Sequence, residues 1–545
     1  MEEIIMRPNI LHIFTDQQRF DTIAALGNPV IKTPNLDRLV KSGIAFTNAF
    51  SPSPVCVPAR CSMIYGQYPC TTGCAANSVP MPQAPKTFMD RLADSGYLTH
   101  GIGKCHFTPN ARALRGFKAR EFQEEMPSAI EPTDYYTMLK NSPWAYAYEA
   151  QGTRGPMYYL PSTSKLPQEM HPTQWIGDRT VAFLEEQKDN TDTPWYCFSS
   201  FVHPHPPFTP PVPWHKLYPA AQMPLPNVPV DYEKLQMFVN KMQNRRKYRD
   251  HGIDVNLVRA IKSYYYACIS FVDYQVGRML DTLEATGQLE NTLILFTTDH
   301  GELLGDYNCF GKRSMHDSCA RIPFIMSWPG KLEAGTTCST PVSLVDIAPT
   351  FLAAAGVPEN DANFDGVDLF KLMKGEISRD AVYSMKSYSG LPKFLGHTPE
   401  EYIGVEVKDN KYHEDRIGSL NGIIGTYPKE YDGIEAQACA SYMIVTEQYK
   451  YVYSVPDNRE FLFDKVRDPR ETNNCAGMVL YKPIQAELRT RLVNYLKDHE
   501  IDGIFDGDNF KKLPELKMPD ALDCGLLQQE VKVDWFDDRL PGYNC

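Results

Sequence analysis

Three short runs of nearly continuous apolar residues lie along this chain, at 9–15, 195–202 and 292–298. Each is rich in β-branched or aromatic residues, which is typical of a strand buried on both faces of a parallel sheet. Over 269–283, apolar residues recur mostly at three- and four-residue steps and predict a helix with one apolar face. Alternating strands and helices favour a mostly parallel sheet covered on both faces. Further helices are expected near 34–42, 87–95 and 180–187.

The pattern changes near residue 375, where short, mostly alternating stretches separated by turn residues begin and predict an antiparallel sheet. The 545 residues are too many for one ordinary core. We therefore expect two domains: a catalytic α/β domain at 1–375, and a smaller C-terminal α+β domain at 376–545 with an antiparallel sheet and a tail. The strand-like stretches are 381–387, 421–426, 442–446, 449–454 and 460–464.

Composition narrows the class of protein. With 43% hydrophobic and 22% charged residues, the chain has the balance of a soluble globular protein. The net charge of −12 argues against a nucleic-acid partner. No apolar run approaches membrane-spanning length, and the first residues lack the pattern of a signal peptide. We therefore expect a cytoplasmic protein without membrane contact.

The 14 cysteines are scattered over a long chain, so we expect reduced thiols rather than a disulfide framework. Four of them cluster, Cys56, Cys61, Cys70 and Cys74, but a zinc knuckle requires two tight pairs. Their spacing fits small packing residues better than a zinc site.

Two of the predicted strands end in pairs of polar residues, Asp16-Gln17 and Asp299-His300. Open α/β sheets place their chemistry at the carboxyl ends of the strands, where two distant pairs can meet. Three oxygen ligands and one nitrogen suit Ca²⁺, Mg²⁺ or Mn²⁺ better than soft metals. Each pair taken alone is more typical of a helix or turn cap.

The pentapeptide 56–60, with a thiol at Cys56, a rigid proline and a guanidinium at Arg60, follows a Ser/Pro-rich loop at 51–54. Its residues suggest a nucleophile beside an anion-binding group, because the planar donors of arginine match a tetrahedral oxyanion. An unmodified Cys56 becomes a nucleophile only as a thiolate, which positive neighbours would favour.

Segment 56–60 resembles the signature of the formylglycine-dependent sulfatases of the alkaline phosphatase superfamily, and segment 96–106 resembles their second signature. The likeness continues through 298–302 to 449–472, in the order and spacing of that family, and so covers most of the chain. It implies an alkaline-phosphatase-like α/β fold and hydrolysis of a sulfate ester.

The resemblance further implies that a maturation enzyme oxidises Cys56 to formylglycine. One hydroxyl of the hydrated aldehyde, activated by the metal, would attack the ester and displace its alcohol. The second hydroxyl would then lose its proton and expel the inorganic anion, which regenerates the aldehyde. Ca²⁺ is the metal expected from the family. Gln17 and His300 depart from the usual sulfatase ligands and resemble phosphonate monoester hydrolases and choline-sulfatase-like members, which leaves Mn²⁺ and Mg²⁺ open.

The resemblance also assigns roles to the remaining motif residues. Arg60 would bridge the nucleophile and the metal, while Lys104 and Lys312 would neutralise sulfate oxygens as charge builds. His106 is the expected base for the second hydroxyl, and His205 would contact the substrate oxygen or protonate the leaving group.

Asn77 is a further candidate for substrate binding, since phosphonate hydrolases of the superfamily use an Asn in a similar position; a turn Asn is the simpler interpretation. The pair Lys104 and His106 favours sulfate esters. Phosphonate monoester or phosphodiester hydrolysis by the same site is the alternative, and a non-catalytic metal-binding relic is a third interpretation. The alcohol half of the ester and the oligomeric state, including a homo-oligomer, are left open.

Overall fold

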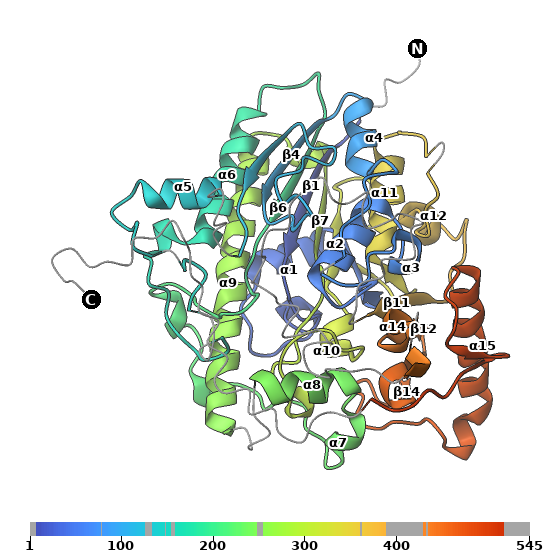
Figure 1. The fold of residues 1–545 in the computed structure, drawn as a ribbon. Coiled ribbons are helices and arrows are strands. Elements are labelled where there is room, and N and C mark those ends of the chain that lie inside the picture. Colours follow the sequence, from blue (N-terminus) through green and yellow to red (C-terminus); the bar gives the residue numbers. More distant parts are fainter. Residues whose placement is uncertain are drawn as a thin grey trace.

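The structure is a computed structural model, and it describes residues 7–516 apart from 78, 126–132, 148, 154–157, 248–253, 360–361, 388–428 and 432–433. Its centre is an eight-stranded sheet with the order β5-β4-β6-β1-β7-β8-β2-β9 (Figure 1). The first five strands run parallel, and β8 is antiparallel to both of its neighbours. The strands are β1 (Asn9–Thr15), β2 (Ile44–Phe46), β4 (Leu98–Gly103), β5 (Ala119–Phe122), β6 (Trp195–Ser200), β7 (Thr292–Thr298), β8 (Phe324–Ser327) and β9 (Thr336–Cys338). The prediction of a mostly parallel α/β sheet is confirmed.

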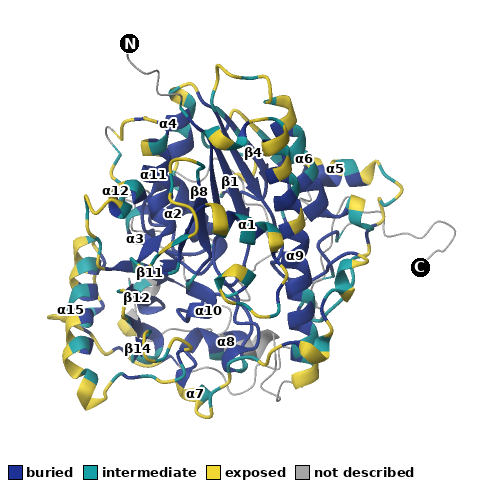
Figure 2. Ribbon diagram, turned by 180° about the vertical axis from the view of Figure 1, so that it is seen from behind, coloured by how far each residue is buried: buried dark blue, intermediate teal, exposed yellow. Residues whose placement is uncertain are grey.

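Helices cover both faces of this sheet, as Figures 1 and 2 show from opposite sides. Residues alternate along β1: Leu11 and Ile13 join the core under α1, α6 and α9, while Ile10 and Phe14 join the core under α2, α4 and α11. The sheet is therefore buried on both sides, which explains its continuous apolar strands. The helices of this part are α1 (Pro34–Ser42), α2 (Cys56–Tyr65), α3 (Pro69–Thr72), α4 (Phe88–Asp94), α5 (Asp134–Lys140), α6 (Pro172–Glu186), α7 (Tyr232–Leu235), α8 (Phe238–Lys247), α9 (Val255–Ala285), α10 (Asp317–Ala320), α11 (Ile347–Ala354) and α12 (Leu369–Met373).

Two helices are longer than their apolar patterns predict. The α6 helix begins at Pro172, one residue after His171, whose ring nitrogen accepts a hydrogen bond from the Thr173 amide and caps the helix. The α9 helix begins after Asp254, which accepts a hydrogen bond from Asn256, and its first turns pack into a separate apolar cluster. Capping and tertiary packing thus extend both helices beyond their periodic segments.

A second, four-stranded antiparallel sheet follows, in the order β11-β12-β13-β14. Its core is continuous with side chains from earlier in the chain, including Phe50, Tyr68 and Tyr307. Helix α15 covers it, and the outer face of that helix is exposed (Figure 2). The expected strand at 421–426 lies outside the described residues. The elements here are β11 (Val382–Lys386), α14 (Glu435–Ala438), β12 (Ser441–Val445), β13 (Tyr449–Ser454), β14 (Arg459–Asp464) and α15 (Lys482–Asp498); the short pairs are β3 (Ala49–Phe50) with β10 (Val342–Ser343) and β15 (Phe505–Asp506) with β16 (Asn509–Phe510).

The register of the central sheet brings the candidate ligands together. Thr15 at the end of β1 pairs with Thr298 at the end of β7, so Asp16 and Asp299 leave the sheet side by side.

None of the helices in the described part of the chain is both long enough and apolar enough to cross a bilayer. The twelve cysteines in that part are all free thiols.

Candidate active site

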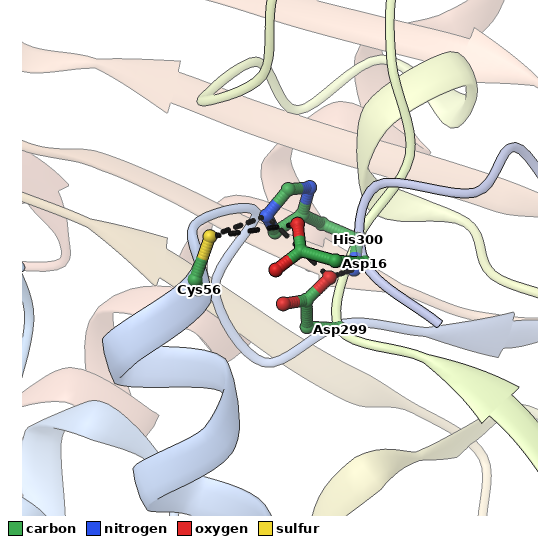
Figure 3. A group of neighbouring side chains, drawn as sticks. All are labelled: Asp16, Cys56, Asp299 and His300. Atoms are coloured by element: carbon green, nitrogen blue, oxygen red, sulfur yellow. Dashed lines mark hydrogen bonds and ion pairs between the residues drawn. The ribbon is translucent and has the colours of Figure 1, made fainter. Parts of the chain in front are cut away.

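The polar residues of the site gather at the carboxyl ends of neighbouring parallel strands, as predicted from the sequence. Two candidate ligands follow β1 and two follow β7, Lys104 follows β4, and His205 lies shortly after β6. Cys56 is the first residue of α2, whose start faces this edge (Figure 3). The residues buried in the site are Asp16, Gln17, Cys56, Arg60, Lys104, His205, Asp299, His300 and Lys312.

The thiol of Cys56 lies beside side chains that the sequence analysis assigned to the metal site and to catalysis. Its Sγ lies 3.3 Å from His300 Nε2 and 3.7 Å from Asp16 Oδ1. Lys312 Nζ lies 2.8 Å from the same sulfur. Both the ammonium group and the helix N-terminus favour negative charge at this position. The geometry therefore suits a nucleophile and the anion that it attacks.

Asn77 makes a structural contact next to the candidate nucleophile, Cys56. Its Oδ1 accepts a hydrogen bond from the backbone amide of Val57, at 3.1 Å. This amide belongs to the first turn of α2, where the N–H groups have no partner within the helix. Asn77 thus caps the helix that begins with Cys56, through the residue next to that cysteine.

Four side chains form a group able to hold a metal ion: Asp16, Cys56, Asp299 and His300 each offer a ligand atom, and these atoms all lie within 4.8 Å of one another (Figure 3). His300 Nδ1 lies 3.0 Å from the Gly301 carbonyl and donates to it, which leaves the Nε2 lone pair for the ion. The Oε1 atom of Gln17 is buried and has no hydrogen-bond partner among the described residues. A buried oxygen without a partner, in the residue that follows Asp16, fits a ligand for a hard or borderline divalent cation.

Cations next to the two aspartates keep both ionised. Burial and the neighbouring Asp299 raise the pKa of Asp16, but Lys104 and other cations outweigh them, so that this pKa lies below its usual value. Burial also raises the pKa of Asp299, and attraction to His300 and Arg60 outweighs burial and lowers it. Both carboxylates are therefore charged near neutral pH and available as ligands.

Arg60 is held by protein groups on every side. Its Nε donates to Asp299 Oδ2 at 3.0 Å and its Nη2 to Asp16 Oδ2 at 3.2 Å. Its Nη1 donates to the Lys104 carbonyl at 2.7 Å and to Ser200 Oγ at 3.1 Å. The guanidinium thus joins the two candidate metal carboxylates.

A carboxylate that sequence reasoning missed lies among the catalytic candidates. Glu125 is buried, forms an ion pair with Lys104, and has Oε1 3.5 Å from His205 Nε2. Lys104 Nζ also lies 2.6 Å from Asp16 Oδ2. Burial lowers the pKa of His205 well below its usual value, while Glu125 acts in the opposite direction. No sequence signal marked Glu125, because it lies in a stretch without periodic pattern or motif.

His106 lies close to Cys56 and Glu125: a ring nitrogen of His106, Cys56 Sγ and a carboxylate oxygen of Glu125 all lie within 4.8 Å of one another. The residue adopts a positive φ of 53°, and its backbone amide donates to Glu124 Oε1 at 2.8 Å. Lys312 is placed by Gln243, whose side-chain amide donates to the Lys312 carbonyl at 2.6 Å.

The histidines without an assigned role are held by structural contacts. His12 Nδ1 lies 3.1 Å from the Tyr196 hydroxyl among buried aromatic rings, His100 pairs with Glu121, and His316 Nδ1 lies 2.7 Å from Ser314 Oγ. His203 Nδ1 lies 3.1 Å from Thr173 Oγ1, so this ring anchors α6 behind His205.

Comparison with known proteins agrees with this arrangement. The sulfatase family model matches residues 8–357, and the model of the N-sulphoglucosamine sulphohydrolase C-terminal region matches 305–412. A choline-sulfatase of Rhizobium meliloti is 30% identical over 383 residues, covering 68% of this chain and 72% of the relative. An arylsulfatase of Clostridium perfringens is 27% identical over 539 residues, covering 93% and 98%. The structure of the phosphonate monoester hydrolase of Agrobacterium radiobacter superposes with a TM-score of 0.73 at 24% identity, covering 90% and 96%.

The mostly parallel central sheet, its flanking helices and the C-terminal antiparallel sheet define the alkaline-phosphatase-like fold class. Within that class, the chain belongs to the sulfatase family, and it is a sulfuric ester hydrolase.

Proposed function

We propose that this enzyme hydrolyses a sulfate monoester with a formylglycine derived from Cys56 and one divalent cation, Ca²⁺ being the first choice over Mn²⁺ and Mg²⁺. The observation that carries the proposal is the position of Cys56, with Asp16 Oδ1 3.7 Å and Lys312 Nζ 2.8 Å from its sulfur. A side-chain atom at the position of this sulfur lies next to the candidate metal ligands and next to the Lys312 ammonium group, which would face the substrate. The maturation enzyme that makes formylglycine is an implied partner.

Asp16, Gln17, Asp299 and His300 would hold the cation, which when bound polarises the attacking oxygen and the sulfate group. Formylglycine supplies a hydroxyl as nucleophile. Lys312 and Lys104 would hold the sulfate oxygens, since both are buried near Cys56 and an ammonium stabilises charge strongly in such a place. The Asn77 cap keeps the attacking atom at the start of α2.

Proton transfer falls to two histidines. His205 donates from Nδ1 to the Pro206 carbonyl at 2.7 Å, so the substrate side of the ring is Nε2. When a sulfate anion lies beside His205 together with Glu125, the two negative groups favour a proton on Nε2. That proton can then pass to the departing alcohol. His106, within 4.8 Å of Cys56, would take the proton from the second hydroxyl of the hydrated aldehyde.

Phosphonate monoester or phosphodiester hydrolysis is the second candidate, supported by the ligand pairs with Gln17 and His300. Sulfate monoesters and phosphonate monoesters both carry one negative charge near neutral pH, so charge does not separate them. We favour sulfate because Lys104 and His106 would contact the group that reacts. Gln17 and His300, in contrast, would mainly affect which cation is bound. The likeness to a choline-sulfatase and an arylsulfatase makes choline sulfate and aryl sulfates the first esters to test.

Two measurements test the proposal. Mass spectrometry of the peptide with residues 56–60 should detect formylglycine in active enzyme and unmodified cysteine in enzyme made without a maturing partner. Turnover of choline sulfate, aryl sulfates, sulfated sugars and phosphonates should give a higher kcat/KM for a sulfate ester than for any phosphonate with the same leaving group. Active protein with wholly unmodified Cys56 would refute the mechanism. A consistent preference for phosphonates would establish the second candidate instead.

A further inference from the structure

The side chain of Gln17 poses a problem of orientation. Its backbone is fixed: the amide donates to Asp299 Oδ1 at 3.1 Å, and the carbonyl accepts from the Tyr265 hydroxyl at 2.7 Å. The two ends of its side-chain amide have almost the same shape, but only the oxygen can bind a cation. Turned the other way, the amide would point its N–H groups at the ion.

Glu302 removes this freedom. Its Oε2 accepts a hydrogen bond from Gln17 Nε2, and the Tyr159 hydroxyl donates to the same oxygen at 3.3 Å. Its Oε1 accepts from the backbone amides of Leu304, at 3.2 Å, and Gly311. All four of these contacts use Glu302 as a hydrogen-bond acceptor, so the group of Gln17 that faces it must be a donor. Only the nitrogen end of Gln17 can face it, and Oε1 becomes the buried oxygen without a partner among the described residues.

We infer that Glu302 is a positioning residue that sets the amide of Gln17 with its oxygen toward the cation. The inference rests on the cation site of the proposed function. Glu302 is a poor ligand itself, because both of its oxygens are already engaged by donors. It acts instead through Gln17, as partners of metal ligands commonly do.

Glu302 also has a second, structural task, and the two tasks divide between its oxygens. Oε1 holds the loop from Leu304 to Gly311, which leads to Lys312. Oε2 serves Gln17 and Tyr159. A test must therefore separate the orientation of Gln17 from the integrity of the loop and from the negative charge that Glu302 adds near the cation.

A double-mutant cycle on cation affinity makes this separation. The four proteins are the wild type, Glu302→Gln, Gln17→Ala and the double variant, each stripped of metal and titrated with Mn²⁺ and with Ca²⁺ by calorimetry. Glu302→Gln should weaken binding by roughly 10- to 100-fold when Gln17 is present, the usual effect of losing such a partner. In the Gln17→Ala background the same substitution should change Kd less than about threefold, because no amide remains to be oriented.

The outcomes are distinct. Equal weakening in both backgrounds would show that Glu302 acts through charge or through the loop, and would overturn the inference. Unchanged affinity in Glu302→Gln would overturn it as well. Absence of cation binding by wild-type protein would instead refute the cation site of the proposed function.

Two further variants keep the test independent of folding. Tyr159→Phe removes the other side-chain donor to Oε2 and leaves Gln17 paired, so its Kd should stay within about threefold of the wild type. If Glu302→Gln does not fold, Glu302→Asp takes its place in the cycle, because it keeps the charge while it withdraws the acceptor from Gln17. Its loss of affinity should likewise vanish in the Gln17→Ala background, and persistence of the loss there would overturn the inference.

Discussion

Replacing Lys104 by Met should reduce kcat/KM for a sulfate ester by at least a hundredfold. The ammonium group is buried, 2.6 Å from Asp16 Oδ2 and paired with Glu125. Methionine keeps much of the volume and removes the charge. Loss of one preorganised donor to the reacting group costs about 10²–10³ in kcat, or roughly 2.7–4 kcal/mol. A Coulomb energy of about 4 kcal/mol for two charges 4 Å apart, at an effective dielectric constant of 20, is of the same size.

The same change removes the ammonium group that pairs with both Glu125 and Asp16, so it should also destabilise the fold. Breaking a buried ion pair by removing one partner costs about 3–5 kcal/mol. The double variant Lys104→Met with Glu125→Gln removes the pair as a unit and should recover most of that stability. Its kcat/KM should remain at least a hundredfold low, because the donor to sulfate is still absent.

The assay is steady-state hydrolysis of a sulfate ester by formylglycine-loaded, metal-saturated enzyme, with thermal unfolding measured on the same samples. Activity that returns with stability in the double variant would show that Lys104 acts through the fold. A loss below tenfold in the single variant would equally contradict its assignment to the sulfate oxygens.

Other predictions follow from the site and the core. Chelation should abolish turnover, and Asp299→Ala should lose both bound metal and activity; full activity in metal-free protein would contradict the cation site. Thiol titration of denatured, unreduced protein should find most of the 14 cysteines free, as a reducing compartment requires; mostly paired cysteines would argue against the cytoplasm. Burial lowers the pKa of His12 to about 3, while the unfolded chain binds this proton near pH 6.5. His12 therefore contributes stability above pH 6.5 that is lost between pH 6.5 and 3, by about 1.4 kcal/mol per pH unit. Denaturant unfolding of His12→Phe should show a shallower fall on acidification, and an unchanged pH slope would refute this.

Much of the architecture is visible in the sequence because each central strand is buried on both faces. The runs at 9–15 and 292–298 match β1 and β7 at both ends, and α1 begins and ends as its pattern predicts. The same property makes the site predictable, since polar residues that follow such a strand lie at one edge of the sheet. The start of α6 was not predicted, because its first turn is fixed by the His171 cap and by packing.

The supporting carboxylates could not be assigned in the same way. Glu302 lies in a recognised motif, but its function depends on donors that are distant in sequence, at positions 17, 159 and 311. Glu125 follows no strand or motif, and only folding brings it to Lys104 and His205. Polar residues that directly follow a buried strand can be predicted from the sequence. Residues that support them through long-range hydrogen bonds can be identified only in the structure.

The charges of the site suggest why the cation would matter for binding as well as for chemistry. Among the described residues, the buried charged side chains close to Cys56 include three positive and three negative groups: Arg60, Lys104 and Lys312, and Asp16, Asp299 and Glu125. These charges cancel, and the chain as a whole carries −12. Without a divalent ion, these six charges provide no net attraction for a sulfate monoester. With the ion, it gains two positive charges to set against the single charge of the ester. Metal removal should therefore weaken the binding of inorganic sulfate and of unreactive sulfate analogues, and unchanged affinity would contradict this account.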